Sequence, residues 1–241
     1  MSKFMKEQHA IDFLVFCVLG NTDDPLVACI DRAYRDMASH TLQLKNKNDE
    51  NKYALRYEAS KKIKEWINNL KIFSSPEEFN NDHKKICEAL QGIYKGSIKS
   101  ENADTITIGQ AQKWANMALK YLCVLNALGK LKDNKLKDML ENNYKFFHIP
   151  IDRYIIKALK MPNIFWSKIE EYNNYLKYQT SKEITENKLD WENTKWIEQA
   201  KIVESDGYRK YCKSQDENIW TKIPVAIRGF FHYWSNYLIN A

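Results

Sequence analysis

Glycine and proline are scarce in this chain, and that scarcity limits the architectures open to it. Only 7 glycines and 5 prolines occur in 241 residues. A β-protein needs frequent tight turns, and such turns draw heavily on these two residues. Apolar residues instead recur at helical spacing along most of the chain, and the strand signal is weak everywhere. We therefore predict an all-α fold of about ten helices.

Capping signals set the boundaries of several predicted helices. Asp23 or Asp24 caps the second helix, and Ser75 caps the fourth, where Glu78 is placed to close a capping box. Asp152 is placed to cap a short helix. A polar loop over residues 95–108 ends in TITI, which is compatible with an extended segment, and a basic connection follows residue 128. In chain order, the predicted helices cover 6–19, a segment from about 25, 51–70, 76–94, 110–128, 152–159, 163–179, a segment from 190, and 223–241.

The composition is that of an ordinary globular protein, with 44% hydrophobic and 28% charged residues. No internal repeat or linker interrupts it, so we predict one all-α domain over residues 1–241. The five cysteines form no C-x-x-C pair, a pattern typical of a reduced, cytoplasmic protein without a zinc or iron–sulfur site. We expect no metal and no cofactor. The apolar run at residues 11–20 is too short to span a bilayer and is predicted to be a core helix, so no membrane association is expected.

One lysine occupies an unusual place in the segment GQAQKWANMALKYL, residues 109–122. Lys113 stands near the predicted start of a helix, where positive partial charge disfavours a cation. On a helical wheel it lies at the edge of the apolar stripe formed by Trp114, Met117, Ala118, Tyr121, Leu122 and Leu125. Its long side chain either reaches water from a poor position, or it serves a site that needs an amine able to lose its proton.

A second motif, Ile149–Pro150–Ile151–Asp152, places its aspartate 39 residues after Lys113. With Gln112–Lys113 opening a helix, this order resembles the active-site elements of the helix-hairpin-helix DNA glycosylases, closest to the archaeal 8-oxoguanine DNA glycosylase branch. The resemblance implies an all-α architecture of two helical lobes around a cleft, here near residues 109–166. It also implies that Lys113 attacks the sugar carbon that bears the base and that Asp152 assists.

The partner that this resemblance implies is duplex DNA with one base flipped out of the stack. Residues near the two motifs are candidates for the base pocket, namely Trp114, Phe146, Phe147, His148 and Trp166. Gly109 and Gln110 are candidates for phosphate contacts because a helix N-terminus presents free amides. Lys130, Lys132 and Lys135 are further phosphate candidates. They lie in residues 95–137, which hold eight lysines against three acids in a chain of net charge +6.

Each of these residues also has a structural interpretation. Asp152 is equally suited to be a plain helix cap, the aromatic residues and His148 to be core, and the lysines to form a solvated surface. An alternative function is therefore a non-catalytic helical binding or assembly module. Its sequence support is a C-terminal apolar stripe, which would form a dimer seam if the chain is not the expected monomer. The stripe consists of Ile227, Phe230, Phe231, Trp234 and Leu238.

The residues leave the base and the biological role open. The resemblance implies an oxidised purine, but a modified pyrimidine, including the bulky bases of some phages, fits the same chemistry. Base repair and antiviral defence therefore both stay open. Phosphoryl transfer finds little support, because the chain has no glycine-rich phosphate loop.

Overall fold

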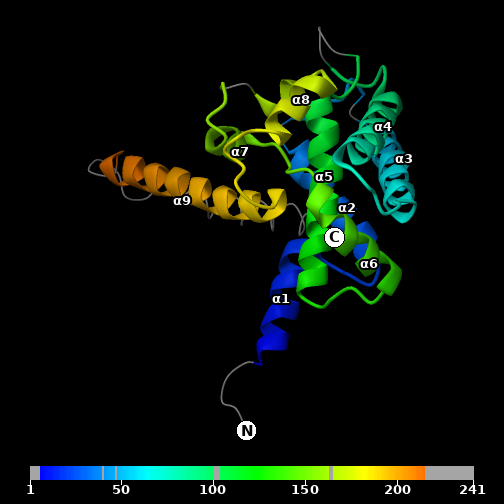
Figure 1. Cartoon of the computed structure of the whole chain (residues 1–241). Coiled ribbons are helices and arrows are strands. Elements are labelled where there is room, and N and C mark those ends of the chain that lie inside the picture. The colour runs from blue at the N-terminus through cyan, green and yellow to red at the C-terminus, as the bar shows by residue number, and fades with distance from the viewer. Residues whose placement is uncertain (1–5, 40, 47, 100–103, 163–164, 215–241) are drawn as a thin grey trace. The chain divides into compact units, whose positions relative to one another are not determined.

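The computed structural model describes residues 6–39, 41–46, 48–99, 104–162 and 165–214. The chain divides into two compact units, Met1–Glu192 and Asn193–Ala241. Among the described residues, all regular elements are helical, apart from one isolated bridge between Leu44 and Ile98 (Figure 1). This confirms the all-α prediction. The predicted extension of a single domain over the whole chain, with two lobes around a cleft, stays a prediction.

The helical elements follow one another with short connections. In order they are α1 (Glu7–Leu19), α2 (Pro25–Ala38), α3 (Asp49–Asn68), α4 (Pro76–Tyr94), α5 (Ile108–Ala127), α6 (Asn134–Asn143), η1 (Tyr144–Phe146), α7 (Arg153–Ala158), η2 (Trp166–Lys168), α8 (Tyr172–Gln179) and α9 (Lys188–Ser214). The first turn of α9 belongs to the first unit, and its continuation from Asn193 makes up the described part of the second unit.

The helix starts follow the capping signals. The Asp24 carboxylate accepts a hydrogen bond from the Val27 amide at 3.1 Å, and Ser75 Oγ accepts one from the Glu78 amide at 3.2 Å. The predicted capping box at Ser75 is wrong in one partner. The Glu78 carboxylate accepts a hydrogen bond from the amide of Ser74, one residue before the cap, at 3.0 Å.

Two segments depart from the predicted boundaries. The stretch taken for a basic connection contains α6, which Asp133 caps by accepting from the Leu136 amide at 3.1 Å. Its buried side chains, Met139, Leu140 and Asn143, follow helical spacing beneath an exposed face of charged and polar residues. The predicted helix over residues 163–179 is shorter in the structure: a 3-10 turn at η2 precedes α8, which begins at Tyr172, and residues 163 and 164 lie outside the described part.

Helix α5 is the centre of the first unit. All twelve of its residues from Ile108 to Leu119 are buried, and α2 packs most extensively against it (Figure 1). On the α2 side, the Trp114 ring packs against Tyr34 at 4.9 Å between centroids and donates through Nε1 to the Ile30 carbonyl at 3.0 Å. Such a position normally requires an apolar helix. Here the buried run also contains Gln110, Gln112, Lys113 and Asn116.

Helix α1 is not the core helix that its apolar sequence predicted. Within it only Leu19 is buried, whereas Phe13, Leu14 and Phe16 are each more than 60% exposed. The helix contacts the rest of the first unit through α2 and through an ion pair of Asp12 with Lys130. Its apolar residues therefore face outward.

The predicted C-terminal helix with its apolar stripe, residues 223–241, lies outside the described residues. Within the described residues, no helix combines the length and the apolar character that a membrane crossing requires.

Candidate functional site

Lys113 lies in the second turn of α5, not in the first turn as the sequence had predicted. Thr107 starts the helix earlier, at Ile108, through a full capping box: Thr107 Oγ1 accepts from the Gln110 amide at 3.1 Å, and Gln110 Oε1 accepts from the Thr107 amide at 3.0 Å. The field of a helix terminus weakens beyond its first turn. The helix start is therefore not the main electrostatic influence on Lys113.

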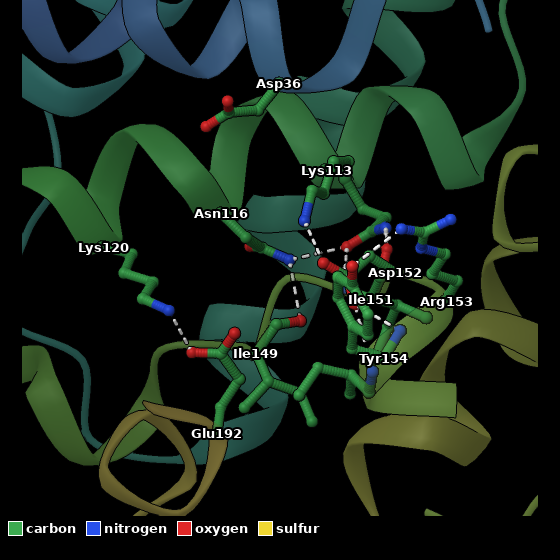
Figure 2. A network of polar contacts seen from close by, with 12 residues as sticks. Asp36, Lys113, Asn116, Lys120, Ile149, Ile151, Asp152, Arg153, Tyr154 and Glu192 are labelled. Carbon is green, nitrogen blue, oxygen red and sulfur yellow. Dashed lines mark hydrogen bonds and ion pairs between the residues drawn. The ribbon is translucent and has the colours of Figure 1, made fainter. Parts of the chain in front are cut away.

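The main partner of Lys113 is Asp152, the other residue singled out in the sequence. Lys113 Nζ donates to Asp152 Oδ2 at 2.9 Å (Figure 2). Lys113 is 5% exposed and Asp152 is 9% exposed, so the two charges meet almost out of contact with water. The structure thus brings together two side chains that are 39 residues apart in the chain.

Asp152 is also the helix cap that the sequence allowed as its structural role. Its second oxygen, Oδ1, accepts hydrogen bonds from the Tyr154 and Ile155 amides at 2.9 and 3.0 Å, which starts α7. One carboxylate oxygen therefore fixes the backbone while the other faces Lys113. The cap and the ion pair hold the carboxylate in one orientation.

Two buried glutamines hold the extended segment that leads into Asp152. Gln112 accepts from the Ile151 amide at 3.2 Å and donates to the Ile151 carbonyl at 3.1 Å. Gln179 binds Ile149 in the same double manner, with both distances at 2.9 Å. Pro150, between them, has no amide hydrogen to satisfy. Side-chain amides thus replace the neighbouring strand that a buried extended segment would otherwise need.

Asn116, one turn after Gln112, connects this segment to a buried network of tyrosines and histidines. Its Nδ2 donates to Gln112 Oε1 at 3.0 Å and to the Tyr175 hydroxyl at 2.8 Å. The Tyr175 hydroxyl lies 2.9 Å from Nδ1 of His148, whose Nε2 lies 2.7 Å from Asn80 Oδ1. Because Asn80 Oδ1 can only accept, His148 carries its proton on Nε2 and accepts from Tyr175. Asn116 Oδ1 itself is buried with no hydrogen-bond partner.

A second buried ion pair lies further along the same helix. Lys120 Nζ contacts the carboxylate of Glu192, which is 1% exposed (Figure 2). Burial raises the pKa of Glu192 above its ordinary value, and the adjacent Lys120 ammonium opposes that rise. The charges of Lys113 and Asp152 also act on Glu192, so the two ion pairs are electrostatically connected.

Together these residues form a polar stripe on α5 that the sequence analysis did not recognise. Gln112, Asn116 and Lys120 follow one another at intervals of four residues, and Lys113 lies beside them on the same side of the helix. That regular spacing inside an otherwise apolar helix was the available signal. Their partners come from distant segments, which no spacing rule could have identified.

The residues predicted for a base pocket are mostly core residues. Trp114 faces α2, while Phe146, Phe147 and His148 are buried. Burial, followed by the nearby His83, lowers the pKa of His148 well below its ordinary value. Trp166 is half-buried, and its backbone covers Gly109. The role of these five residues in a base pocket stays a prediction.

The predicted phosphate contacts fall into two groups. The Gly109 amide already donates to the Ile169 carbonyl at 2.8 Å, and Gln110 closes the capping box, so neither is free to bind a phosphate in this structure. Lys132 and Lys135 are exposed. Lys130 is partly exposed and paired with Asp12. The lysines are thus suited to bind a polyanion, whereas the N-terminus of α5 is not.

In the described part of the chain, no group of three or more histidine, cysteine or acidic side chains is arranged to hold a metal ion. A groove of about 520 Å³ lies between α2 and α3, and its lining residues include neither Lys113 nor Asp152.

Comparison with known proteins gave no matching family model, no matching curated protein and no matching solved structure.

Proposed function

We propose that this protein is a DNA glycosylase that removes a damaged or modified base, with Lys113 as nucleophile and Asp152 as its acidic partner. The observation that carries the proposal is the 2.9 Å contact between Lys113 Nζ and Asp152 Oδ2, both buried. Base excision through a lysine requires these two functional groups in contact. Stability alone gives no reason for such a pair, because desolvation of two charges offsets most of their attraction.

The chemistry follows from the contact. Lysine attacks only as a neutral amine, so the proton on Nζ passes to Asp152 Oδ2 when substrate displaces the ion pair. The amine then attacks the sugar carbon that bears the base, and the base leaves with the electron pair of the N-glycosidic bond. The attacking nitrogen gives one of its protons to the departing base. Asp152 passes its proton to the ring oxygen as the bond between that oxygen and the sugar carbon breaks, which leaves a protonated Schiff base between Lys113 and that carbon. In a monofunctional variant of the mechanism, Asp152 activates water and Lys113 only contacts the DNA.

The surroundings favour a fixed carboxylate. Its Oδ1 is held by two amides of α7, and Gln112 and Gln179 hold the preceding segment. A preorganised charge of this kind stabilises positive charge on a sugar better than a mobile one. Because both side chains are nearly covered, the proposal requires that the site opens when DNA binds.

The partner that we propose is duplex DNA. The net charge of +6 and the exposed Lys132 and Lys135 support a polyanionic ligand. The base stays open between an oxidised purine and a modified pyrimidine, and so does the role between repair and antiviral defence. A panel of duplex oligonucleotides, each with one modified base, is the direct way to find the substrate.

The test is borohydride trapping on the substrate found in that panel. Wild-type protein should be linked covalently to DNA, whereas Lys113→Gln should lose the link and keep DNA binding. Lys120→Gln is the matched control, because Lys120 forms the other buried ion pair of the same helix. Asp152→Asn should lose base release by orders of magnitude. Asparagine still caps α7, so this change removes the charge and keeps the helix cap. Full base release by Asp152→Asn would refute both mechanistic variants.

A non-catalytic binding or assembly module is the second candidate. The outward-facing apolar residues of α1 favour it. It becomes the better proposal if no DNA binding is measurable at low salt.

A further inference from the structure

Helix α1 exposes an apolar surface that has no role in the proposed catalysis. Phe13, Leu14, Phe16 and Val18 are 64%, 61%, 65% and 43% exposed, and Cys17 between them is exposed as well. We call these five residues the α1 arc. Single exposed apolar residues are normal, but a contiguous group of them marks an interaction site.

Helical geometry shows that the α1 arc is one continuous surface. At about 100° per residue, its five members span roughly 200° of the helix circumference. Leu19, Val15 and Asp12 fall on the opposite side, where Leu19 is buried, Val15 packs on the core and Asp12 pairs with Lys130. Helix α1 therefore packs against the rest of the first unit through one side only. From Ala10 to Val18 no polar or charged side chain interrupts the other side.

The area of the α1 arc corresponds to a small protein interface. With about 200 Å² for a whole phenylalanine, Phe13 and Phe16 each expose roughly 130 Å². Leu14 and Val18 bring the total to the order of 400 Å², which is about half of what one partner contributes to a standard interface.

The chemistry of this surface selects among possible occupants. Nucleic acid needs cations, and the α1 arc has none. A membrane-surface helix carries lysine or arginine on its polar side, whereas the charged residues of α1 are Glu7 and Asp12. A uniformly apolar surface is complementary to itself, as a two-fold symmetric interface requires. We propose that the α1 arc is a homodimer interface and that its occupant is the α1 arc of a second copy of this chain.

Sedimentation velocity on the full-length protein tests this, with reductant present so that Cys17 forms no disulfide. The wild type should sediment as a dimer at low micromolar concentration. Phe13→Glu with Phe16→Glu should weaken dimerisation by on the order of 100-fold or more, because two charges would be buried against each other. Leu14→Ala should weaken it by about tenfold, since it removes apolar contact area alone.

Ile72→Glu and Phe165→Glu are matched controls, because those residues are 61% and 73% exposed elsewhere. Both should remain dimeric, and circular dichroism should show the same helix content in all variants as in the wild type. A monomeric wild type would overturn the proposal, as would a dimer that the arc variants leave intact. So would a monomer that binds phosphatidylcholine vesicles through Phe13 and Phe16, which would make the surface a membrane contact. The outcome does not depend on the chemistry of Lys113 and Asp152.

Discussion

Acidification from pH 7 to pH 5 should destabilise this protein through two histidines that the fold buries without charge. Burial lowers the pKa of His83 to about 3 and that of His148 well below its ordinary value. Both rings are held as neutral hydrogen-bonding partners: His83 Nδ1 lies 2.8 Å from the Tyr172 hydroxyl, and His148 bridges Tyr175 and Asn80. Their ring centroids are 4.8 Å apart, so protonation of one also disfavours protonation of the other.

The direction of the change in unfolding free energy follows from the number of protons that the folded and unfolded states bind. Below the ordinary histidine pKa of 6.5, the unfolded chain takes up protons that the folded protein refuses. The stabilisation is therefore fully present above pH 6.5 and is lost as the pH falls towards 3. At pH 5, a shift from 6.5 to about 3 costs roughly 2 kcal/mol for His83. His148 acts in the same direction, so the total loss is larger than that of His83 alone and is a substantial part of the 5–15 kcal/mol typical of a domain.

Urea unfolding followed by tryptophan fluorescence at several values between pH 7 and pH 5 measures this loss. His83→Phe removes one titrating group and leaves the hydrogen bond from the Tyr172 hydroxyl to the Asn80 carbonyl intact. It should reduce the limiting slope of unfolding free energy against pH by about 1.4 kcal/mol per pH unit. His9→Gln, on the exposed α1, is the matched control substitution.

One group acts in the opposite direction and needs its own control. The raised pKa of Glu192 makes the folded state take up a proton at a higher pH than the unfolded chain, which adds stability on acidification. Measurements in a Glu192→Gln background remove that contribution. Equal unfolding free energies at pH 7 and pH 5 in this background would refute the histidine argument, as would a slope that His83→Phe does not change.

Three further predictions concern backbone contacts and DNA. Gly109→Ala should destabilise the fold by about 3 kcal/mol in urea unfolding, because a Cβ there would lie 1.8 Å from the carbonyl oxygen of η2, whereas Gly92→Ala, with open space around it, should stabilise α4 by about 0.5–1 kcal/mol. Equal effects of the two changes would contradict the close packing. Gln179→Leu should cost about 2–4 kcal/mol, since it leaves a buried amide and carbonyl of the I-P-I segment unpaired, and a change below 1 kcal/mol would mean that water replaces it. Lys130→Glu with Lys132→Glu should weaken DNA binding for all sequences and flatten its salt dependence in fluorescence anisotropy, and unaltered binding would place the DNA elsewhere.

The sequence predicted helix starts correctly where the capping contacts are formed between residues close together in the chain. Ser75 and Asp24 cap their helices through contacts within three residues, so sequence alone was sufficient. Helix α6 was missed because its lysines obscured the apolar spacing of Leu136, Met139 and Leu140. The role of α1 was misjudged because an apolar helix can be covered by its own chain or left for a partner, and composition does not distinguish the two.

The sequence by itself determined the helical class and most helix starts. It also indicated Lys113 and Asp152 as candidates, through the order of Gln112–Lys113 and Ile149–Asp152. Only the tertiary structure decided that Lys113 and Asp152 are in contact and that both are buried. It also decided that side chains of Gln112, Asn116 and Gln179 hold the extended segment from Ile149 to Ile151. The physical reason is that burial and hydrogen-bond partners depend on which distant segments are packed together. Tyr175, His148 and Glu192 reach α5 from other parts of the chain, so their contribution emerges only when the core closes around that helix.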